Sequence, residues 1–224
     1  SSAASDVYKR QALQGAIGSA GLRGITDLIP AYADLTVCYD CTVISAKALQ
    51  RQLRRLLDSL SVAGQDRRRV FRLPVCYGGD YGPDLDFVCH HSGLSAQEVI
   101  ALHSAPDYLI YMLGFLPGFA YLGGLDPRLH TPRLDSPRTC IPAGSVGIGG
   151  AQTGVYPLAS PGGWQLLGRT PVSVFDRQRQ EPILYRAGDL VHFVPISHAE
   201  YEEIARAVAA GTYTVQVEEV PVCD

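Results

Sequence analysis

Lysine is almost absent from this sequence. Its only two lysines are Lys9 and Lys47, and neither follows a glycine. A P-loop needs a lysine directly after its glycines to reach the phosphates of a nucleotide. A Rossmann dinucleotide site needs a third glycine, but the run that starts at Gly147 and Gly149 has Gln152 at that position, with no strand–helix unit around it. The sequence therefore predicts neither of the two commonest nucleotide-binding loops.

An excess of positive charge is also missing. The chain has 19 lysines and arginines against 22 aspartates and glutamates, which gives a formal net charge of −3. A general nucleic-acid binder needs a basic face, so nucleic acid is not expected as a partner. No long apolar run is present either: the most apolar window, 105–125, is interrupted by Asp107, Pro117 and several glycines. We interpret it as a buried segment, so no membrane partner is expected.

The cysteines do not form a recognisable framework. Cys38 and Cys41 form an isolated C-x-x-C pair with no second pair at zinc spacing, so no metal site is predicted. No signal peptide opens the sequence, and the chain is too large for a disulfide-stapled mini-protein. These features together favour a reduced, cytoplasmic protein. The six cysteines are scattered, at Cys38, Cys41, Cys76, Cys89, Cys140 and Cys223.

Three regions follow one another along the chain. Residues 1–11 are small, polar and aperiodic, which favours a disordered leader or a segment foreign to the fold. Residues 12–70 form a small α/β domain, with a strand at 35–39 and an amphipathic helix that Ser45 opens and Gly64 ends. Residues 71–224 form the second domain, which is rich in short strands.

Turn residues dominate the second domain. Glycine and proline recur every few residues from Phe115 to Pro171, between short apolar runs, and this pattern favours a β-barrel or sandwich. A strand at 70–76 is expected to be broken by Pro74, and Asp84 to cap a short helix. Ser-x-x-Glu capping boxes predict helices after Ser95 and Ser197. Further strands are expected at 107–115, 183–185, 191–194 and 213–217.

The most informative stretch runs from Ser145 to Thr170. Two Pro-Arg steps, at Arg133 and Arg138, lie in a loop before it, and Arg169 closes it. Arginine binds carboxylate or phosphate through two parallel hydrogen bonds, so an anionic small molecule fits this composition. The alternative is that these arginines only fix loops or meet a protein partner. Ser145 sits in a near match to the nucleophile-elbow motif, but no helix follows, so a turn serine is favoured.

Several motifs together carry a resemblance. They are LPVCYGGDYGPDL (73–85), GFLPGFAYL (114–122), IPAGSVGI (141–148) and SPGGWQLLGRT (160–170). The chain resembles the PxpB/KipI family, also called allophanate hydrolase subunit 1, whose domain also occurs in the carboxyltransferase region of urea carboxylase. The likeness runs from about residue 24 to 217. It implies an α+β fold, with a small N-terminal α/β domain followed by a cyclophilin-like β-barrel. The family begins with a further strand that residues 1–11 do not resemble, so we expect a truncated or replaced N-terminus.

The resemblance also implies a function. Members serve as the B subunit of an ATP-dependent 5-oxoprolinase, which opens 5-oxo-L-proline to L-glutamate together with a LamB/YcsF-like A subunit and a PxpC/KipA-like C subunit. We therefore expect a hydrolase component that is inactive alone, with ATP as a cofactor of the complex and no metal. Two alternatives stay open: a KipI-like inhibitor of a sporulation histidine kinase, and a component of a urea or amide carboxylase.

Motif position and chemistry suggest the site residues. A site half completed by a partner is preferred over a closed pocket. Replacing Arg138 by alanine is expected to abolish turnover and keep the fold, because a loop arginine contributes little packing. The predicted catalytic residues are Arg138, Gln152, Thr153 and Tyr156, and the predicted substrate-binding residues are Arg133, Ser145, Ser160, Gly162, Gly163, Trp164, Arg169 and Thr170.

Overall fold

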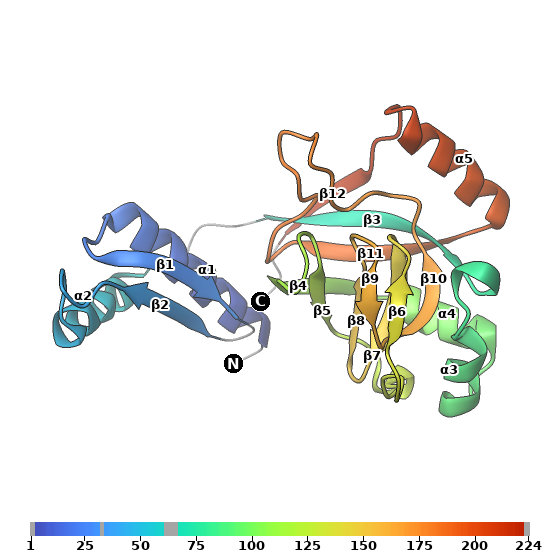
Figure 1. Cartoon of the computed structure of the whole chain (residues 1–224), viewed down its shortest axis with the longest axis horizontal. Helices are drawn as coiled ribbons and strands as arrows, with labels where there is room; N and C mark the ends of the chain where they lie inside the picture. The colour runs from blue at the N-terminus through green and yellow to red at the C-terminus, as the bar shows by residue number, and fades with distance from the viewer. Residues whose placement is uncertain (1–2, 32–33, 61–66, 222–224) are drawn as a thin grey trace. The chain divides into compact units, whose positions relative to one another are not determined.

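A computed structural model describes residues 3–31, 34–60 and 67–221 (Figure 1). The chain divides into two compact units, residues 1–66 and 67–224. The domain boundary predicted between residues 70 and 71 therefore falls within the first strand of the second unit, four residues after that unit begins. The two units are described separately below. Among the described residues, no helix has the length and apolar character needed to cross a membrane.

The first unit contains two helices and a two-stranded antiparallel sheet. Its elements are α1 (Ala3–Ala20), β1 (Ile25–Pro30), β2 (Leu35–Tyr39) and α2 (Ala46–Ser59). The strand at 35–39 and the helix start at Ser45 were predicted correctly, and the Ser45 hydroxyl accepts a hydrogen bond from the backbone N–H of Ala48. Helix α2 ends at Ser59, before the predicted stop at Gly64, which lies outside the described residues.

Helix α1 covers residues 3–11 of the segment that was expected to be either a disordered leader or foreign to the fold. Its sequence, AASDVYKRQALQGAIGSA, has no clear apolar stripe, and that absence led to the wrong expectation. Alanine, glutamine, lysine and arginine nevertheless have high intrinsic helix propensity. Composition rather than periodicity is therefore the signal for this helix.

The second unit is built on a closed β-barrel, which confirms the predicted α+β class and its barrel. The strand order is β10-β7-β8-β5-β4-β11-β3, and β10 also pairs with β3 to close the ring (Figure 1). Strand β12 extends the sheet beside β3, and β6 pairs with β9 in a separate two-stranded sheet. The strands are β3 (Arg67–Tyr77), β4 (Asp107–Leu113), β5 (Ala120–Gly123), β6 (Arg138–Ile141), β7 (Ser145–Gly149), β8 (Gln152–Val155), β9 (Ser160–Gly162), β10 (Gln165–Arg169), β11 (Leu190–Ile196) and β12 (Gln216–Pro221).

Three helices of this unit begin where the sequence predicts, after Asp84, Ser95 and Ser197. Both capping boxes are present, at Ser95 with Glu98 and at Ser197 with Glu200. Asp84 occupies the N-cap position of α3, but its side chain makes no capping hydrogen bond. The expected capping role of this carboxylate is therefore wrong. The helices are η1 (Gly79–Tyr81), α3 (Leu85–Ser92), α4 (Ala96–Ser104), η2 (Pro127–Leu129) and α5 (His198–Ala209).

Three strand predictions need correction. Strand β3 is not broken at Pro74. Its partner β12 pairs with it only as far as Arg72, and its partner β10 pairs with it only from Cys76, so neither pairs with residues 73–75. The missing N–H of proline thus falls in a stretch where that edge of β3 has no partner. Residues 183–185 form only an isolated bridge, between Ile183 and Phe175, and the last strand starts at residue 216 rather than 213.

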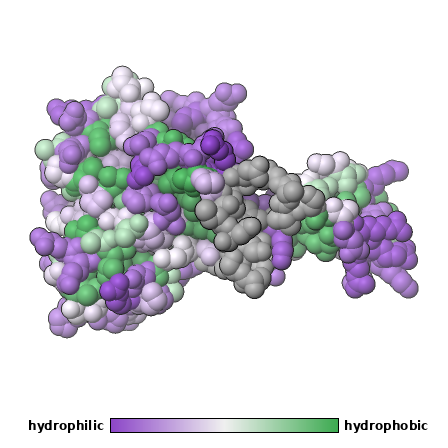
Figure 2. Space-filling model, turned by 180° about the vertical axis from the view of Figure 1, so that it is seen from behind, coloured by the Kyte–Doolittle hydropathy of each residue, from purple (hydrophilic) through white to green (hydrophobic). Residues whose placement is uncertain are grey.

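One apolar core fills the barrel. Alternate residues of the strands point inward, so that Val146 and Ile148 of β7 lie in the core with Val155 of β8. Their neighbours Gly147 and Gly149 belong to the outer face. On the face of this unit seen in Figure 2, apolar and polar residues lie intermixed.

Candidate functional site

A second, smaller apolar cluster lies on the outer face of the barrel. Trp164 is 5% exposed and packs edge-on against Phe119 and Tyr156, with ring-centroid distances of 5.4 and 6.2 Å. We call this the aromatic cluster; its members are Phe119, Ile141, Tyr156, Trp164 and Leu166. It joins the motifs around residues 119, 141 and 164, which are far apart in the sequence.

The glycines of the motif allow these rings to approach the backbone. A Cβ atom on Gly149 would lie 2.3 Å from Nε1 of Trp164, and one on Gly162 would lie 2.6 Å from the Tyr156 hydroxyl. A Cβ on Gly154 would lie 3.1 Å from Cζ3 of the same tryptophan. The contacts below 3.0 Å exclude a larger residue unless neighbouring atoms shift, and a Cβ on Gly154 would also lie 2.9 Å from the carbonyl of Ala120. The glycine-rich stretch is therefore strand structure that accommodates large rings, and not a phosphate-binding loop.

Arg138 connects the aromatic cluster to helix α3. The sequence predicted a loop position for Arg138, but the residue is the first of strand β6. Its guanidinium donates to Oδ1 of Asp84 at 2.7 Å, while Oδ2 of that carboxylate accepts the backbone N–H of Leu166 at 2.7 Å. The side chains of Asp84 and Arg138 are 11% and 30% exposed. Arg138 thus neutralises a buried carboxylate. The sequence analysis did not predict this contact, because it interpreted Asp84 as a helix cap.

Arg133 is the exposed member of the group. Its guanidinium lies 5.8 Å from the centre of the Trp164 ring. Burial raises the pKa of the Tyr156 hydroxyl, and the positive charges of Arg133 and Arg138 offset part of that rise. The structure thus brings together six of the predicted residues: Arg133, Arg138, Tyr156, Gly162, Gly163 and Trp164.

Thr153 lies elsewhere, in a polar chain inside the barrel in which Thr153 and His103 are fully buried and Tyr77 is half-buried. Its hydroxyl donates to the carbonyl of Gly147 at 3.0 Å, so it accepts from Nε2 of His103 at 2.8 Å. Nδ1 of His103 then accepts from the Tyr77 hydroxyl at 2.8 Å. This order assigns one neutral tautomer to the imidazole. The catalytic role of Thr153 stays a prediction, but its hydroxyl already has two partners.

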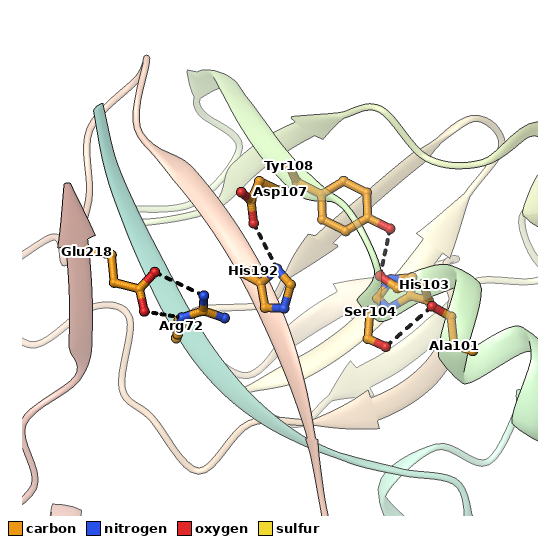
Figure 3. Close-up of polar contacts among 8 residues, drawn as sticks. All are labelled: Arg72, Ala101, His103, Ser104, Asp107, Tyr108, His192 and Glu218. Atoms are coloured by element: carbon orange, nitrogen blue, oxygen red, sulfur yellow. Dashed lines mark hydrogen bonds and ion pairs between the residues drawn. The ribbon is translucent and has the colours of Figure 1, made fainter. Parts of the chain in front are cut away.

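His103 is the residue that sequence analysis missed in this region. It is one of several scattered histidines, and nothing in its spacing sets it apart. Burial lowers the pKa of its imidazole to about 3. The hydroxyl of Tyr108 donates to its backbone carbonyl at 2.7 Å (Figure 3). The same view shows two partly exposed pairs that join neighbouring strands, His192 with Asp107 and Arg72 with Glu218.

We expect His103 to make the fold sensitive to acid. Its folded-state pKa lies below the unfolded value near 6.5, so the unfolded state binds the extra proton between about pH 6.5 and 3. Stability therefore falls as pH falls through this window, by about 3 kcal/mol at pH 4. Urea unfolding at pH 7 and pH 4 measures the loss. His103→Gln keeps a neutral donor and acceptor, so its free energy of unfolding should fall less between pH 7 and pH 4 than that of wild type. The control variant His90→Gln, at an exposed position, should show the same fall as wild type. Equal pH slopes in His103→Gln and wild type would contradict the assignment.

The remaining predicted residues make other contacts. Ser145 and Ser160 still adjoin the first group, since the carbonyl of Ser145 accepts the N–H of Tyr156 and Ser160 pairs with Ile141. Arg169 lies over the ring of Tyr81, 5.4 Å from its centre. The Thr170 hydroxyl accepts the N–H of Val172, and Gln152 is half-buried at the β7–β8 turn. The hydroxyls of Ser145 and Ser160 are buried without a hydrogen-bond partner. The predicted convergence of all three arginines on one face is thus not seen, because Arg169 contacts a different set of side chains.

Metal ligands do not gather in the described part of the chain. No group of three histidine, cysteine, aspartate or glutamate side chains is arranged there to hold an ion. The polar groups described above are instead arginine guanidinium groups, the imidazole of His103, the carboxylate of Asp84, and hydroxyls of serine, threonine and tyrosine.

Comparison with known proteins gives a consistent result. The family model of the carboxyltransferase domain, subdomains C and D, matches residues 2–185. The chain is 46% identical over 188 residues to the 5-oxoprolinase B subunit of Bacillus subtilis, covering 80% of this chain and 78% of that protein. It is 51% identical over 172 residues to the 5-oxoprolinase B subunit of Escherichia coli O157:H7, covering 76% of this chain and 78% of that protein.

More distant similarities extend to urea-processing proteins and to a solved structure. A putative urea carboxylase of Emericella nidulans is 28% identical over 216 residues, which cover 83% of this chain but 17% of that protein. The crystal structure of TTHA0988 superposes with a TM-score of 0.76 at 41% identity, covering 88% of this chain and 38% of that one. The fold described here therefore recurs as one part of longer chains.

Proposed function

The chain belongs to the family of the carboxyltransferase domain, subdomains C and D, and we propose on this premise that it is the B subunit of a 5-oxoprolinase. The observation that supports the proposal best is its 46% and 51% identity to two proteins of that name, over more than three quarters of their length. The relatives related to urea carboxylase are more distant and are matched over a small share of their length.

The proposed reaction opens the lactam of 5-oxo-L-proline to L-glutamate, with hydrolysis of ATP. A lactam amide is a stable, planar group, and catalysis of its opening depends on donors placed where negative charge develops. The arginines and hydroxyls on the outer face of the barrel are donors of this kind. The described residues contain no P-loop lysine, so ATP does not fit a standard loop on this chain. We therefore assign ATP use to the complex and leave open which subunit contacts the nucleotide.

Two partners complete the proposed enzyme, a LamB/YcsF-like A subunit and a PxpC/KipA-like C subunit. Two side chains beside the aromatic cluster are open to a partner. Arg133 is exposed, and Phe115 is 64% exposed. Phe115 also has a φ of 67°, which is unfavourable for a residue with a side chain. This exposure supports a site that is shared with another protein of the complex, and it leads us to expect no activity from this chain alone.

Reconstitution with omission tests the proposal. This chain is mixed with the A and C subunits encoded beside it, and 5-oxo-L-proline-dependent release of glutamate and phosphate is measured. We expect turnover in the complete mixture and background rates when any one of the three proteins is left out. Undiminished activity from A and C without this chain would contradict the proposal. So would an inactive complete mixture in which the three proteins bind one another.

The same preparation distinguishes the alternatives. Inhibition of histidine-kinase autophosphorylation by this chain, without 5-oxoprolinase activity, would favour a kinase regulator. Transfer of carboxyl groups to urea or another amide in the presence of a biotin carboxylase would favour the carboxylase role.

A further inference from the structure

Arg169 is an arginine without a carboxylate. It is half-buried at the end of β10, its Nε has no hydrogen-bond partner, and no ion pair involves it within the described residues. Its counterpart Arg138 shows the usual arrangement, in which a buried Asp84 neutralises the guanidinium. A sequestered charge normally has a counter-charge, because desolvation without one is costly. The surroundings of Arg169 therefore suit an anionic ligand.

The register of the barrel places two further side chains next to Arg169. It pairs with Ser145 of β7 on one side and with Cys76 of β3 on the other. Directly opposed residues of antiparallel strands point to the same face, with Cβ atoms about 4.5–5.5 Å apart. The three side chains thus form one row, which lies on the outer face because their neighbours Val75 and Val146 belong to the core.

The Ser145 hydroxyl is the second donor of this row. The residue is fully buried, and its Oγ has no hydrogen-bond partner. The preceding Gly144 has a φ of +81°, and a Cβ there would lie 2.4 Å from the carbonyl of Thr170 and 3.4 Å from Cγ of Arg169. Glycine at this position is therefore required by the positive φ and by the carbonyl of Thr170. A buried hydroxyl without a partner next to an arginine without an anion is the arrangement of a receptor for an oxyanion.

Two tyrosines enclose the row. The Tyr81 ring lies beneath the Arg169 guanidinium and packs on Tyr201 of α5, with centroids 4.2 Å apart. Burial raises the pKa of Tyr201, and the charge and hydrogen bonding of Arg169 offset part of that rise. The carboxylate of Glu202 accepts from the Tyr81 hydroxyl at 2.7 Å. This hydrogen bond fixes the Tyr81 ring against which the guanidinium lies.

We propose that Arg169 and Ser145 bind the carboxylate of a small monoanionic ligand. One guanidinium supplies one positive charge and a planar fork of donors, which matches a carboxylate and would leave a phosphate dianion only half neutralised. This inference rests on the proposed function, in which the ligand is the carboxylate of 5-oxo-L-proline. It separates substrate recognition at Arg169 from the aromatic cluster around Trp164.

Kinetics of the reconstituted complex test this assignment. Arg169→Gln keeps most of the length of the side chain and removes the charge, and we expect a 10- to 100-fold higher KM for 5-oxo-L-proline with an unchanged KM for ATP. Ser145→Ala should raise the same KM about 3- to 10-fold while the melting temperature stays equal or rises, because the hydroxyl has no partner in the protein. Arg128→Gln, at an exposed pair with Asp126, is the matched control and should leave both KM values unchanged. Unchanged KM for 5-oxo-L-proline in both site variants would overturn the inference.

A binding measurement separates this inference from the proposed function. Saturation-transfer NMR on the full chain compares 5-oxo-L-proline with 2-pyrrolidinone, the same lactam without the carboxylate. We expect wild type to prefer 5-oxo-L-proline and Arg169→Gln to lose that preference, whether or not the complex turns over. No preference in wild type would overturn the carboxylate site. Tighter binding of inorganic phosphate, lost in Arg169→Gln, would also overturn it and assign the row to a phosphate.

Discussion

Replacing Trp164 by alanine should destabilise the barrel unit by about 3–5 kcal/mol, the usual cost of removing a buried tryptophan. The ring is 5% exposed, and it fills the space that Gly149 and Gly154 leave on the outer face. Its removal leaves a cavity between Phe119 and Tyr156, whose rings pack on it from two sides. These glycines cannot fill the cavity, because they carry no side chain that could rearrange into it.

Urea unfolding followed by circular dichroism measures the loss, since Trp164 is the only tryptophan and the variant has no indole fluorescence. Trp164→Phe should lose less than alanine, because a phenyl ring refills part of the cavity. Phe87→Ala, at a ring that is 48% exposed, is the control for removing a large aromatic side chain from the surface. A loss below about 1 kcal/mol in Trp164→Ala, well short of the usual range for a buried ring, would show that the cluster does not depend on it.

Local sequence signals predicted the parts of the fold that depend on neighbouring residues. The capping boxes at Ser95 and Ser197 mark helix starts correctly, because a cap is completed within four residues. The density of glycine and proline correctly indicated short strands and left a barrel and a sandwich open, whereas the family resemblance implied the barrel. Closure of the ring depends on β10 pairing with β3, two strands that are far apart in the sequence. Neither periodicity nor turn chemistry contains that information.

The candidate site shows the same limit. Residue types and motif position selected Arg133, Arg138 and Trp164, and the structure brings them together. The sequence did not separate Arg169 from them, because register across three strands decides its neighbours. The partner of Arg138 was also missed, since an aspartate before a helix is usually interpreted as a cap. Here Asp84 bonds to residues 54 and 82 positions away.

That contact reverses the expectation for Arg138→Ala. The sequence suggested lost turnover with an intact fold, but the structure leads us to expect a loss of about 2–4 kcal/mol in the free energy of unfolding. Removal of the guanidinium leaves the carboxylate of Asp84 buried and unpaired, and breaking a buried pair from one side costs up to about 3–5 kcal/mol. The 30% exposure of the Arg138 side chain places the expected value below the top of that range.

A double-mutant cycle separates the charge from the packing. Asp84→Asn should cost less than Arg138→Ala, because the arginine left behind is the more exposed partner and the amide oxygen still accepts from Leu166. The double variant Asp84→Asn/Arg138→Ala should be more stable than Arg138→Ala alone, since no unpaired charge then stays buried. Urea unfolding of the four proteins gives the coupling energy. If Arg138→Ala keeps full stability and only its turnover in the complex falls, the guanidinium acts on a ligand and not on Asp84. Loss of stability with recovery in the double variant would instead make Arg138 a structural link between α3 and the aromatic cluster, and would leave Arg169 as the barrel arginine available to a substrate carboxylate.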